Sequence, residues 1–134
     1  MAQRRFVWLS AMLIAGCIAS GCRKNPNPVW QAEARSPDGV VVARARSLQG
    51  SERGNAYAAT SVYLLRGSKD SVEVLDFDNS YGAMWLEMKW LTARHLEVSY
   101  GPTTSRDILS IDFQAVKVAD VEISLRRGRA GSPR

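Results

Sequence analysis

The sequence is poor in the residues on which most catalytic and metal sites depend. It has a single histidine, His95, and its two cysteines, Cys17 and Cys22, both lie near the N-terminus. One histidine excludes a histidine-rich zinc site and leaves one place where a histidine could activate a nucleophile. Because His95 follows Arg94 at the start of an expected strand, we interpret it as a half-exposed sheet residue. We therefore expect no catalytic residues, no cofactor and no enzymatic activity.

The first residues have the layout of a secretory signal. Arg4 and Arg5 precede an apolar run from Phe6 to Ile18, and small residues follow. A membrane-spanning helix needs about 20 apolar residues, and this run is shorter. We predict that residues 1–21 are a helical signal peptide and that the protein is exported.

Both cysteines are preceded by glycine, Gly16 before Cys17 and Gly21 before Cys22. This segment resembles the lipobox of bacterial lipoproteins, in which the cysteine is acylated. The family's preference for a branched aliphatic residue three places earlier favours Cys17, because that position holds Ile14. Modification at Cys17 would leave Cys22 as a lone thiol in an oxidising compartment, which favours Cys22. We predict palmitate and related acyl chains on Cys22, with Cys17 as the alternative.

The lipoprotein resemblance also implies a location in the cell envelope. An aspartate after the acylated cysteine is similar to an inner-membrane retention signal, and here that position holds Arg23. We therefore expect attachment to the outer membrane, facing the periplasm, in preference to the inner membrane. Several acyl chains on one cysteine make attachment to the bilayer effectively permanent. The polar, proline-containing residues 22–28 are predicted to form a short tether.

The net charge of +5 would ordinarily favour a nucleic-acid partner. From Trp30 to Leu125, however, the chain has 10 Lys and Arg against 13 Asp and Glu, a net charge of −3. The basic excess lies at the two ends, and the C-terminal residues 126–134 contain Gly and Pro as well as Arg. We predict a disordered basic tail over 126–134 and no nucleic-acid binding.

Residues 29–125 are expected to form one all-β domain, because short runs of alternating apolar and polar residues are broken by turn residues. The pattern predicts a single small antiparallel meander or sandwich of about eight strands. The predicted strands are 29–35, 40–48, 57–66, 71–77, 83–91, 95–100, 106–113 and 116–125. Residues 49–55 are predicted to be the longest loop, and a break is expected at Ala119 and Asp120, where the apolar alternation changes phase.

Alternation also predicts which side chains face the core. In the three predicted strands before the last, 83–91, 95–100 and 106–113, the predicted core residues are Met84, Leu86, Met88, Trp90, Leu96, Val98, Tyr100, Leu109, Ile111 and Phe113. Trp85 falls on the opposite face from Trp90, beside Glu87 and Lys89. Trp85, Tyr81 and Tyr57 are therefore predicted to form an exposed aromatic interaction surface, unless a loop covers Trp85.

Two short motifs carry a resemblance. Ser36-Pro37-Asp38-Gly39 with Ala43, and Trp90 with Leu96 and Val98, are similar to the S-P-D-G-x-x-x-A and W-x(5)-L-x-V phrases of TolB-type β-propeller blades. The chain is too short for a closed propeller. The same phrases occur in small bacterial lipoproteins with one all-β domain, which this chain resembles over most of its length. That resemblance implies a fold and supplies no catalytic residues.

The weak candidate for a metal site is the segment from Asp76 to Gly82. Asp76, Asp78 and Ser80 followed by Glu87 have the spacing of a calcium loop, but Tyr81 stands where that loop needs glycine. We interpret the segment as an ordinary turn.

The function predicted from these features is a non-enzymatic binding or envelope-assembly module, anchored to the bilayer, whose partner is an unknown envelope protein or a glycan. The alternative is a small carboxylate-dependent hydrolase or sugar-binding protein that uses Asp76, Asp78 and Glu87. Acid–base hydrolysis of a glycoside needs two carboxyl groups facing each other across a pocket, about 5–10 Å apart.

Overall fold

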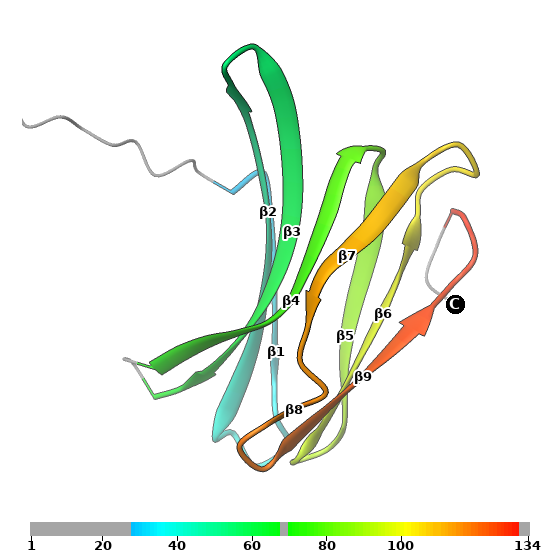
Figure 1. Cartoon of the computed structure of the whole chain (residues 1–134). Helices are drawn as coiled ribbons and strands as arrows, with labels where there is room; N and C mark the ends of the chain where they lie inside the picture. The colour runs from blue at the N-terminus through cyan, green and yellow to red at the C-terminus, as the bar shows by residue number, and fades with distance from the viewer. Residues whose placement is uncertain (1–27, 68–69, 132–134) are drawn as a thin grey trace, which may run out of the picture.

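The computed structural model describes residues 28–67 and 70–131, in which all the regular structure is β (Figure 1). The predicted signal peptide and both cysteines lie outside the described residues. Between residues 28 and 131, no described segment forms a helix with the length and apolarity of a membrane span.

Nine strands form two sheets in the described part of the chain. Sheet A contains, in spatial order, β1 (Trp30–Arg35), β2 (Val41–Glu52), β3 (Asn55–Arg66), β4 (Asp70–Tyr81) and β7 (Ile108–Gln114). Sheet B contains β5 (Met84–Thr92), β6 (His95–Pro102), β9 (Val121–Arg127) and β8 (Lys117–Val118). The prediction of a small all-β sandwich is confirmed. One pairing is not antiparallel: β9 returns to lie parallel to β6, with Leu96 beside Ile123.

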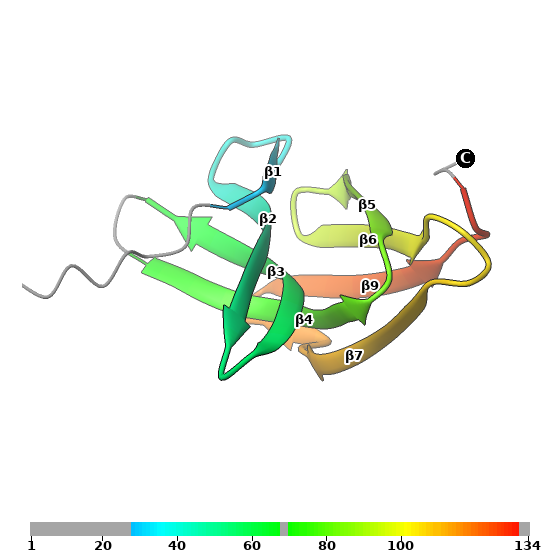
Figure 2. The same cartoon turned by 90° about the horizontal axis from the view of Figure 1, so that it is seen from above.

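The core lies between the two sheets, whose arrangement is seen from above in Figure 2. Phe77 of β4 and Tyr100 of β6 meet at its centre, with ring centroids 4.8 Å apart and a tilted geometry. Such aromatic pairs add stability beyond the area that they bury. The other buried apolar residues are Val41, Ala43, Ala45, Val62, Leu64, Val74, Leu75, Leu96, Val98, Val121 and Ile123.

The predicted inner face of β5 is confirmed, since Met84, Leu86, Met88 and Trp90 all pack against the core. Trp90 is half-buried and not fully buried as expected. Its indole N–H donates to the carbonyl oxygen of Ala34 in β1 at 2.9 Å. This bond joins two edge strands, one from each sheet, and closes that side of the sandwich.

The prediction for β7 is wrong in part. Leu109 packs against the core, but the side chains of Ile111 and Phe113 are 40% and 47% exposed. The pairing shifts between these residues, because Ile111 lies opposite Phe77 while Phe113 lies opposite Asp76. This β-bulge turns Phe113 to the outer face of sheet A, so the alternation of β7 no longer points to the core.

The turn at Ser36-Pro37-Asp38-Gly39 forms as its sequence predicts. Gly39 has φ of 74°, a conformation that favours glycine, and its N–H donates to the carbonyl oxygen of Ser36 at 2.8 Å. The Ser36 hydroxyl donates to Asp38 Oδ1 at 2.7 Å and accepts the N–H of Val41 at 3.0 Å. The hydroxyl and the carbonyl oxygen of the buried Ser36 therefore both form hydrogen bonds within the turn.

The predicted loop over residues 49–55 is wrong. β2 continues to Glu52 and β3 begins at Asn55, so a two-residue turn of Arg53 and Gly54 joins them. Both turn residues have positive φ, 50° and 82°. That combination matches the right-handed twist of the flanking strands and makes a long, regular hairpin.

The break predicted before the last strand is confirmed. Ala119 has φ of 53°, and it separates β8 from β9 together with Asp120. The predicted start of the basic tail is wrong, because Arg126 and Arg127 are the last residues of β9. Beyond them, the N–H of Gly128 donates to the backbone carbonyl oxygen of Tyr100 at 2.8 Å. Residues 132–134 lie outside the described part.

A chain of ion pairs ties the turns at one end of the sandwich. Arg94 contacts Asp38 at 3.0 Å and Asp120 at 2.7 Å, and Arg66 also pairs with Asp120. These side chains come from the end of β3 and from three turns, those between β1 and β2, β5 and β6, and β8 and β9. Exposed pairs contribute little one by one, and a network that joins four segments contributes more.

Candidate binding cleft

A cleft of about 710 Å³ lies at the other end of the sandwich. The β2–β3 hairpin extends beyond the point where β4 turns into β5, so the two sheets separate there (Figure 1). The hairpin forms one wall, and Met84 and Leu86 at the start of β5 lie on the other. Val29 and Trp30 border the cleft where the described chain begins. Its volume lies within the range of small-ligand sites.

None of the sixteen residues that line this cleft is ionisable at neutral pH. The polar groups are the hydroxyls of Ser47, Thr60 and Ser80 and the side-chain amides of Gln49 and Asn79. A charged ligand would leave water there without gaining an opposite charge, which is costly. The lining therefore favours an uncharged ligand.

Hydrogen bonds order part of the polar wall. The hydroxyls of Ser47 and Thr60 lie 2.7 Å apart, and Thr60 donates to Asn79 Oδ1 at 3.2 Å. The Ser80 hydroxyl accepts the N–H of Ala58 at 3.0 Å and replaces a strand-to-strand bond. This network holds the side-chain oxygen of Asn79 in the wall of the cleft.

Trp30 is one of the large apolar residues that line the cleft, together with Met84, Trp85 and Leu86. In the register of β1, β2 and β3, Trp30 lies opposite Ser47, which lies opposite the buried Thr60. Paired residues share a face of the sheet, so the indole of Trp30 is on the inner face, toward the cleft. It is 38% exposed. A flat, accessible ring beside fixed amide groups can stack on one face of a ligand and leave its edges to hydrogen-bond.

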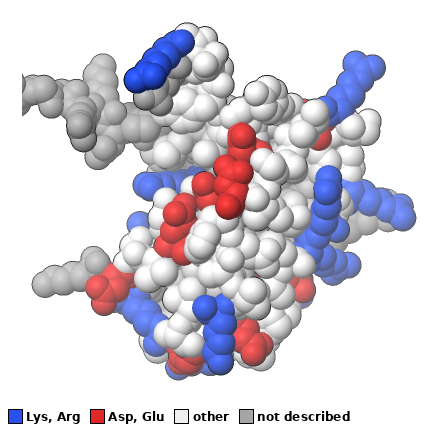
Figure 3. Space-filling view, in the orientation of Figure 1, with Lys and Arg blue, Asp and Glu red and all other residues white. Residues whose placement is uncertain are grey.

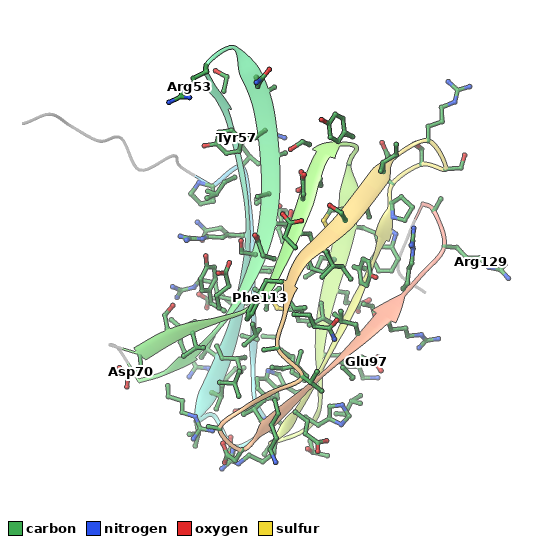
Figure 4. All side chains as sticks on the ribbon, viewed as in Figure 1. Arg53, Tyr57, Asp70, Glu97, Phe113 and Arg129 are labelled. Carbon is green, nitrogen blue, oxygen red and sulfur yellow. The ribbon has the colours of Figure 1, made fainter. Side chains whose placement is uncertain are left out.

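Tyr57 borders the same cleft from the back of the hairpin. It lies opposite Gly50 in the β2–β3 register, and a Cβ at Gly50 would be 2.6 Å from the Tyr57 ring. The ring therefore covers Gly50 on the outer face of sheet A. Figure 4 shows Tyr57 on the side of the hairpin away from β4 and β5.

Trp85 is partly covered by the segment around Gly128 and Arg129, which agrees with the alternative that a loop covers this residue. Its indole lies over Gly101 of β6 and over Gly128, and its N–H donates to the carbonyl oxygen of Arg129 at 3.2 Å. A second hollow of about 610 Å³ is lined by Trp85, Ser99 and residues 126–131. Figure 4 shows Arg129 extending from this segment into solvent. Trp85 is half-buried and belongs to the outer face of sheet B.

Of the three residues predicted to form an aromatic surface, Tyr57 and Trp85 line the cleft from different sheets, and Tyr81 does not line it. Tyr57 lies on the back of the hairpin, Trp85 lies on the outer face of sheet B, and Tyr81 ends β4 with 78% of its side chain exposed. Alternation predicted correctly that these three side chains do not point into the core. It did not show that Tyr57 and Tyr81 belong to sheet A and Trp85 to sheet B.

The candidate carboxylates are also separated. Asp76 and Asp78 lie in β4 of sheet A, where Asp76 accepts a hydrogen bond from Ser61 at 2.8 Å. Glu87 lies in β5 of sheet B, on the face opposite Met88 and the core. Among the described residues, no three His, Cys, Asp or Glu side chains are grouped to hold a metal ion. None of Asp76, Asp78 and Glu87 lines the cleft.

His95 lies where the sequence placed it, half-exposed at the start of β6. Its Nε2 is 2.9 Å from the Ser124 hydroxyl on the neighbouring strand β9. The sequence prediction missed Trp30, Gln49 and Asn79 as residues that line the cleft. Only Trp30 carried a signal, as an aromatic residue at the start of a strand. Comparison with protein-family models, curated proteins and solved structures finds no match to this chain.

Proposed function

We propose that this protein is a lipid-anchored binding module of the bacterial cell envelope and that its cleft binds a neutral saccharide. The export signal and the lipobox-like segment before Cys22 support the anchor. The observation that carries the ligand proposal is an uncharged cleft lined by the exposed residue Trp30 and by amide and hydroxyl groups.

Neutral saccharides fit this lining in two respects. The carbon-bound hydrogens on one face of a sugar ring give it an apolar surface that can stack on an indole. Its hydroxyl groups donate and accept hydrogen bonds, as do the amides of Gln49 and Asn79. Because the described lining has no carboxylate, these residues bind a sugar without the groups that would cleave it.

The position of the cleft agrees with a role close to the membrane. Val29 borders the cleft and follows Cys22 by seven positions. Seven residues span at most about 25 Å. A protein acylated at Cys22 would hold this cleft within that distance of the bilayer surface, where envelope glycans meet the membrane.

Titration with neutral oligosaccharides tests the proposal. The full-length protein in detergent is titrated with tetrasaccharides of glucose and of N-acetylglucosamine, and tryptophan fluorescence and calorimetry report binding. We expect saturable binding by at least one of them. Trp30→Ala should weaken binding at least about tenfold, because a stacked ring contributes a kilocalorie or more, and Gln49→Ala should weaken it by a smaller factor.

Tyr81→Ala is the matched control, because it removes an exposed aromatic ring outside the cleft. It should leave the affinity unchanged. Absence of binding of either sugar up to about 10 mM, the weak end of measurable affinities, would overturn the saccharide proposal. Equal loss of binding in Trp30→Ala and Tyr81→Ala would remove the cleft as the site.

A further inference from the structure

Strand β7 is the most exposed strand of the sandwich. Six of its seven residues are exposed, and only Leu109 is half-buried. Ile108, Ile111 and Phe113 expose 66%, 40% and 47% of their side chains. Large apolar side chains that occur singly on a surface need no explanation, but three exposed on one seven-residue strand mark that strand as a candidate interaction site.

This strand is also an open edge of sheet A. In the described part of the chain, β7 pairs with β4 on one side and with no strand on the other. The opposite edge, β1, is in contact with β5 and joined to it by the bond between Trp90 and Ala34. The remaining edge, β8, has two residues. β7 is therefore the long edge whose backbone N–H and C=O groups can pair with a further strand.

Carboxylates line the outer face beside this edge. Asp78 lies opposite Ser110 and Asp76 lies opposite Phe113 in the β4–β7 register, so Asp76 and Asp78 are on the outer face. The Ser110 hydroxyl is 3.5 Å from Asp112 Oδ1, which places Asp112 beside them. A band of acidic side chains crosses the molecule over β4 and β7, with basic side chains only at its margins (Figure 3).

The three carboxylates form no ion pair with the described Lys and Arg side chains. None of them is within 4.0 Å of a Lys or Arg nitrogen among residues 28–67 and 70–131, whereas Glu33, Asp38 and Asp120 are paired. Hydrogen bonding by Ser80, through its side chain and its backbone N–H, lowers the pKa of Asp78. The face therefore presents uncompensated negative charge next to exposed apolar side chains and unpaired backbone groups.

We propose that β7 binds an extended basic segment of a partner protein, which adds a strand to the free edge of sheet A. Backbone hydrogen bonds to β7 would supply affinity that does not depend on sequence. Lys or Arg side chains on one face of the added strand would lie beside Asp78 and Asp112. Apolar side chains on its other face would cover Ile111. This site lies on β7 and is independent of the cleft at Trp30.

The complementary charge decides between this partner and a second copy of the chain. An antiparallel pair of two β7 strands would bring the Asp112 carboxylates of both copies to one interface, and like charges directly across a pair of strands are destabilising. A basic strand meets opposite charge along the same edge, which favours association and its specificity.

The probe is an octapeptide of alternating Lys and Val, labelled with a fluorophore and titrated with the full-length protein in detergent. The matched peptide has Glu in place of Lys. We expect saturable binding of the Lys peptide, at least about tenfold weaker binding of the Glu peptide, and weakening by added salt. Amide hydrogen exchange should slow at residues 108–113 when the Lys peptide is bound.

Asp112→Lys reverses one charge on the edge strand, and Glu87→Lys makes the same change on the outer face of sheet B. Asp112→Lys should weaken binding of the Lys peptide at least about tenfold, and Glu87→Lys should leave it unchanged. Equal effects of the two variants, equal binding of both peptides, or protection elsewhere than β7 would overturn the proposal. Protection of residues 108–113 that grows with protein concentration in the absence of peptide would assign the edge to a second copy instead.

Discussion

The indole of Trp85 lies against the Cα of Gly128 so closely that a Cβ at that position has no room. The two residues belong to different segments, the start of β5 and the chain just after β9. The ring also covers Gly101 on the strand between them, where a Cβ would be 2.8 Å from the indole. Trp85 therefore spans three neighbouring segments of sheet B and holds the C-terminal segment on its outer face.

Gly128→Ala should destabilise the protein by about 1–3 kcal/mol, because the added methyl group forces the ring or the backbone to move. The measurement is urea unfolding followed by circular dichroism. In a Trp85→Ala background the same change should cost less than about 0.5 kcal/mol, since the obstructing ring is absent. An unchanged cost in the two backgrounds would contradict the contact.

Trp90 tests the closure of the sandwich between β1 and β5. Trp90→Phe keeps most of the ring but removes the donor to Ala34, and it should cost about 1 kcal/mol. Trp90→Ala should cost about 3 kcal/mol, at the low end for a large aromatic residue because the side chain is half-buried. Unfolding by urea gives both values. Equal costs for the two variants would show that the hydrogen bond, and not packing, carries the stabilisation.

Acid should weaken the fold through Asp38. The Ser36 hydroxyl first, then the Val40 N–H and Arg94, lower the pKa of Asp38 in the folded protein. A carboxyl whose pKa is lowered by folding stabilises the folded state at pH values above its pKa in the unfolded chain, which is near 3.9. That contribution is lost as the pH falls through the pKa of the folded state. The melting temperature should therefore fall between about pH 5 and pH 3, and the fall should be shallower in Asp38→Asn. Thermal unfolding at a series of pH values measures both, and an identical pH dependence in Asp38→Asn would exclude this carboxyl.

Arg53 occupies a backbone conformation that suits other residues better. Its φ of 50° is left-handed, and it precedes Gly54 in the two-residue turn between β2 and β3. Asparagine is favoured at this position of such a turn, so Arg53→Asn should stabilise the protein by about 0.5 kcal/mol. Gly54→Ala, at φ of 82°, should destabilise it by about 1 kcal/mol. Thermal unfolding should show shifts of opposite sign, and a shift in the same direction would contradict the turn geometry.

The predicted acylation can be tested in cells with a clickable palmitate analogue. We expect the full-length protein to be labelled and Cys22→Ala to lose most of the label, because the acyl chains are attached to that sulfur. Label that persists in Cys22→Ala and is lost in Cys17→Ala would move the anchor to Cys17. A wild-type protein without label would overturn the lipoprotein prediction.

Alternation of apolar and polar residues predicted the inward-facing side chains correctly in strands that have one face in the core and the other in solvent. In β5 and β6 every second residue packs inward, so Met84 to Trp90 and Leu96 to Tyr100 were placed correctly. It failed for β7, because a bulge between Ile111 and Phe113 changes which face each side chain meets, and no local signal marks that bulge. Period-two patterns predict the face of a side chain only while the register is regular.

The binding features needed information from distant parts of the chain. The cover on Trp85 depends on two glycines, Gly101 and Gly128, that lie outside the strands predicted from alternation. The cleft exists because the β2–β3 hairpin is longer than the strands that face it, which follows from the tight turn at Arg53 and Gly54. Such relationships arise from how the elements pair and how long each one is, and not from the pattern within any single element.

The parallel pairing of β6 with β9 sets the order in which this chain can fold. The strands β1 to β4 pair as successive hairpins, so their contacts close short loops and can form early. Sheet B is different, because Leu96 of β6 pairs with Ile123 of β9. The chain between these two residues first forms β7 and β8, so the pairing joins residues far apart in sequence. Contacts between residues far apart in sequence slow folding. During synthesis the apolar face of sheet A, which includes Phe77, therefore stays without its full cover until β9 has been added.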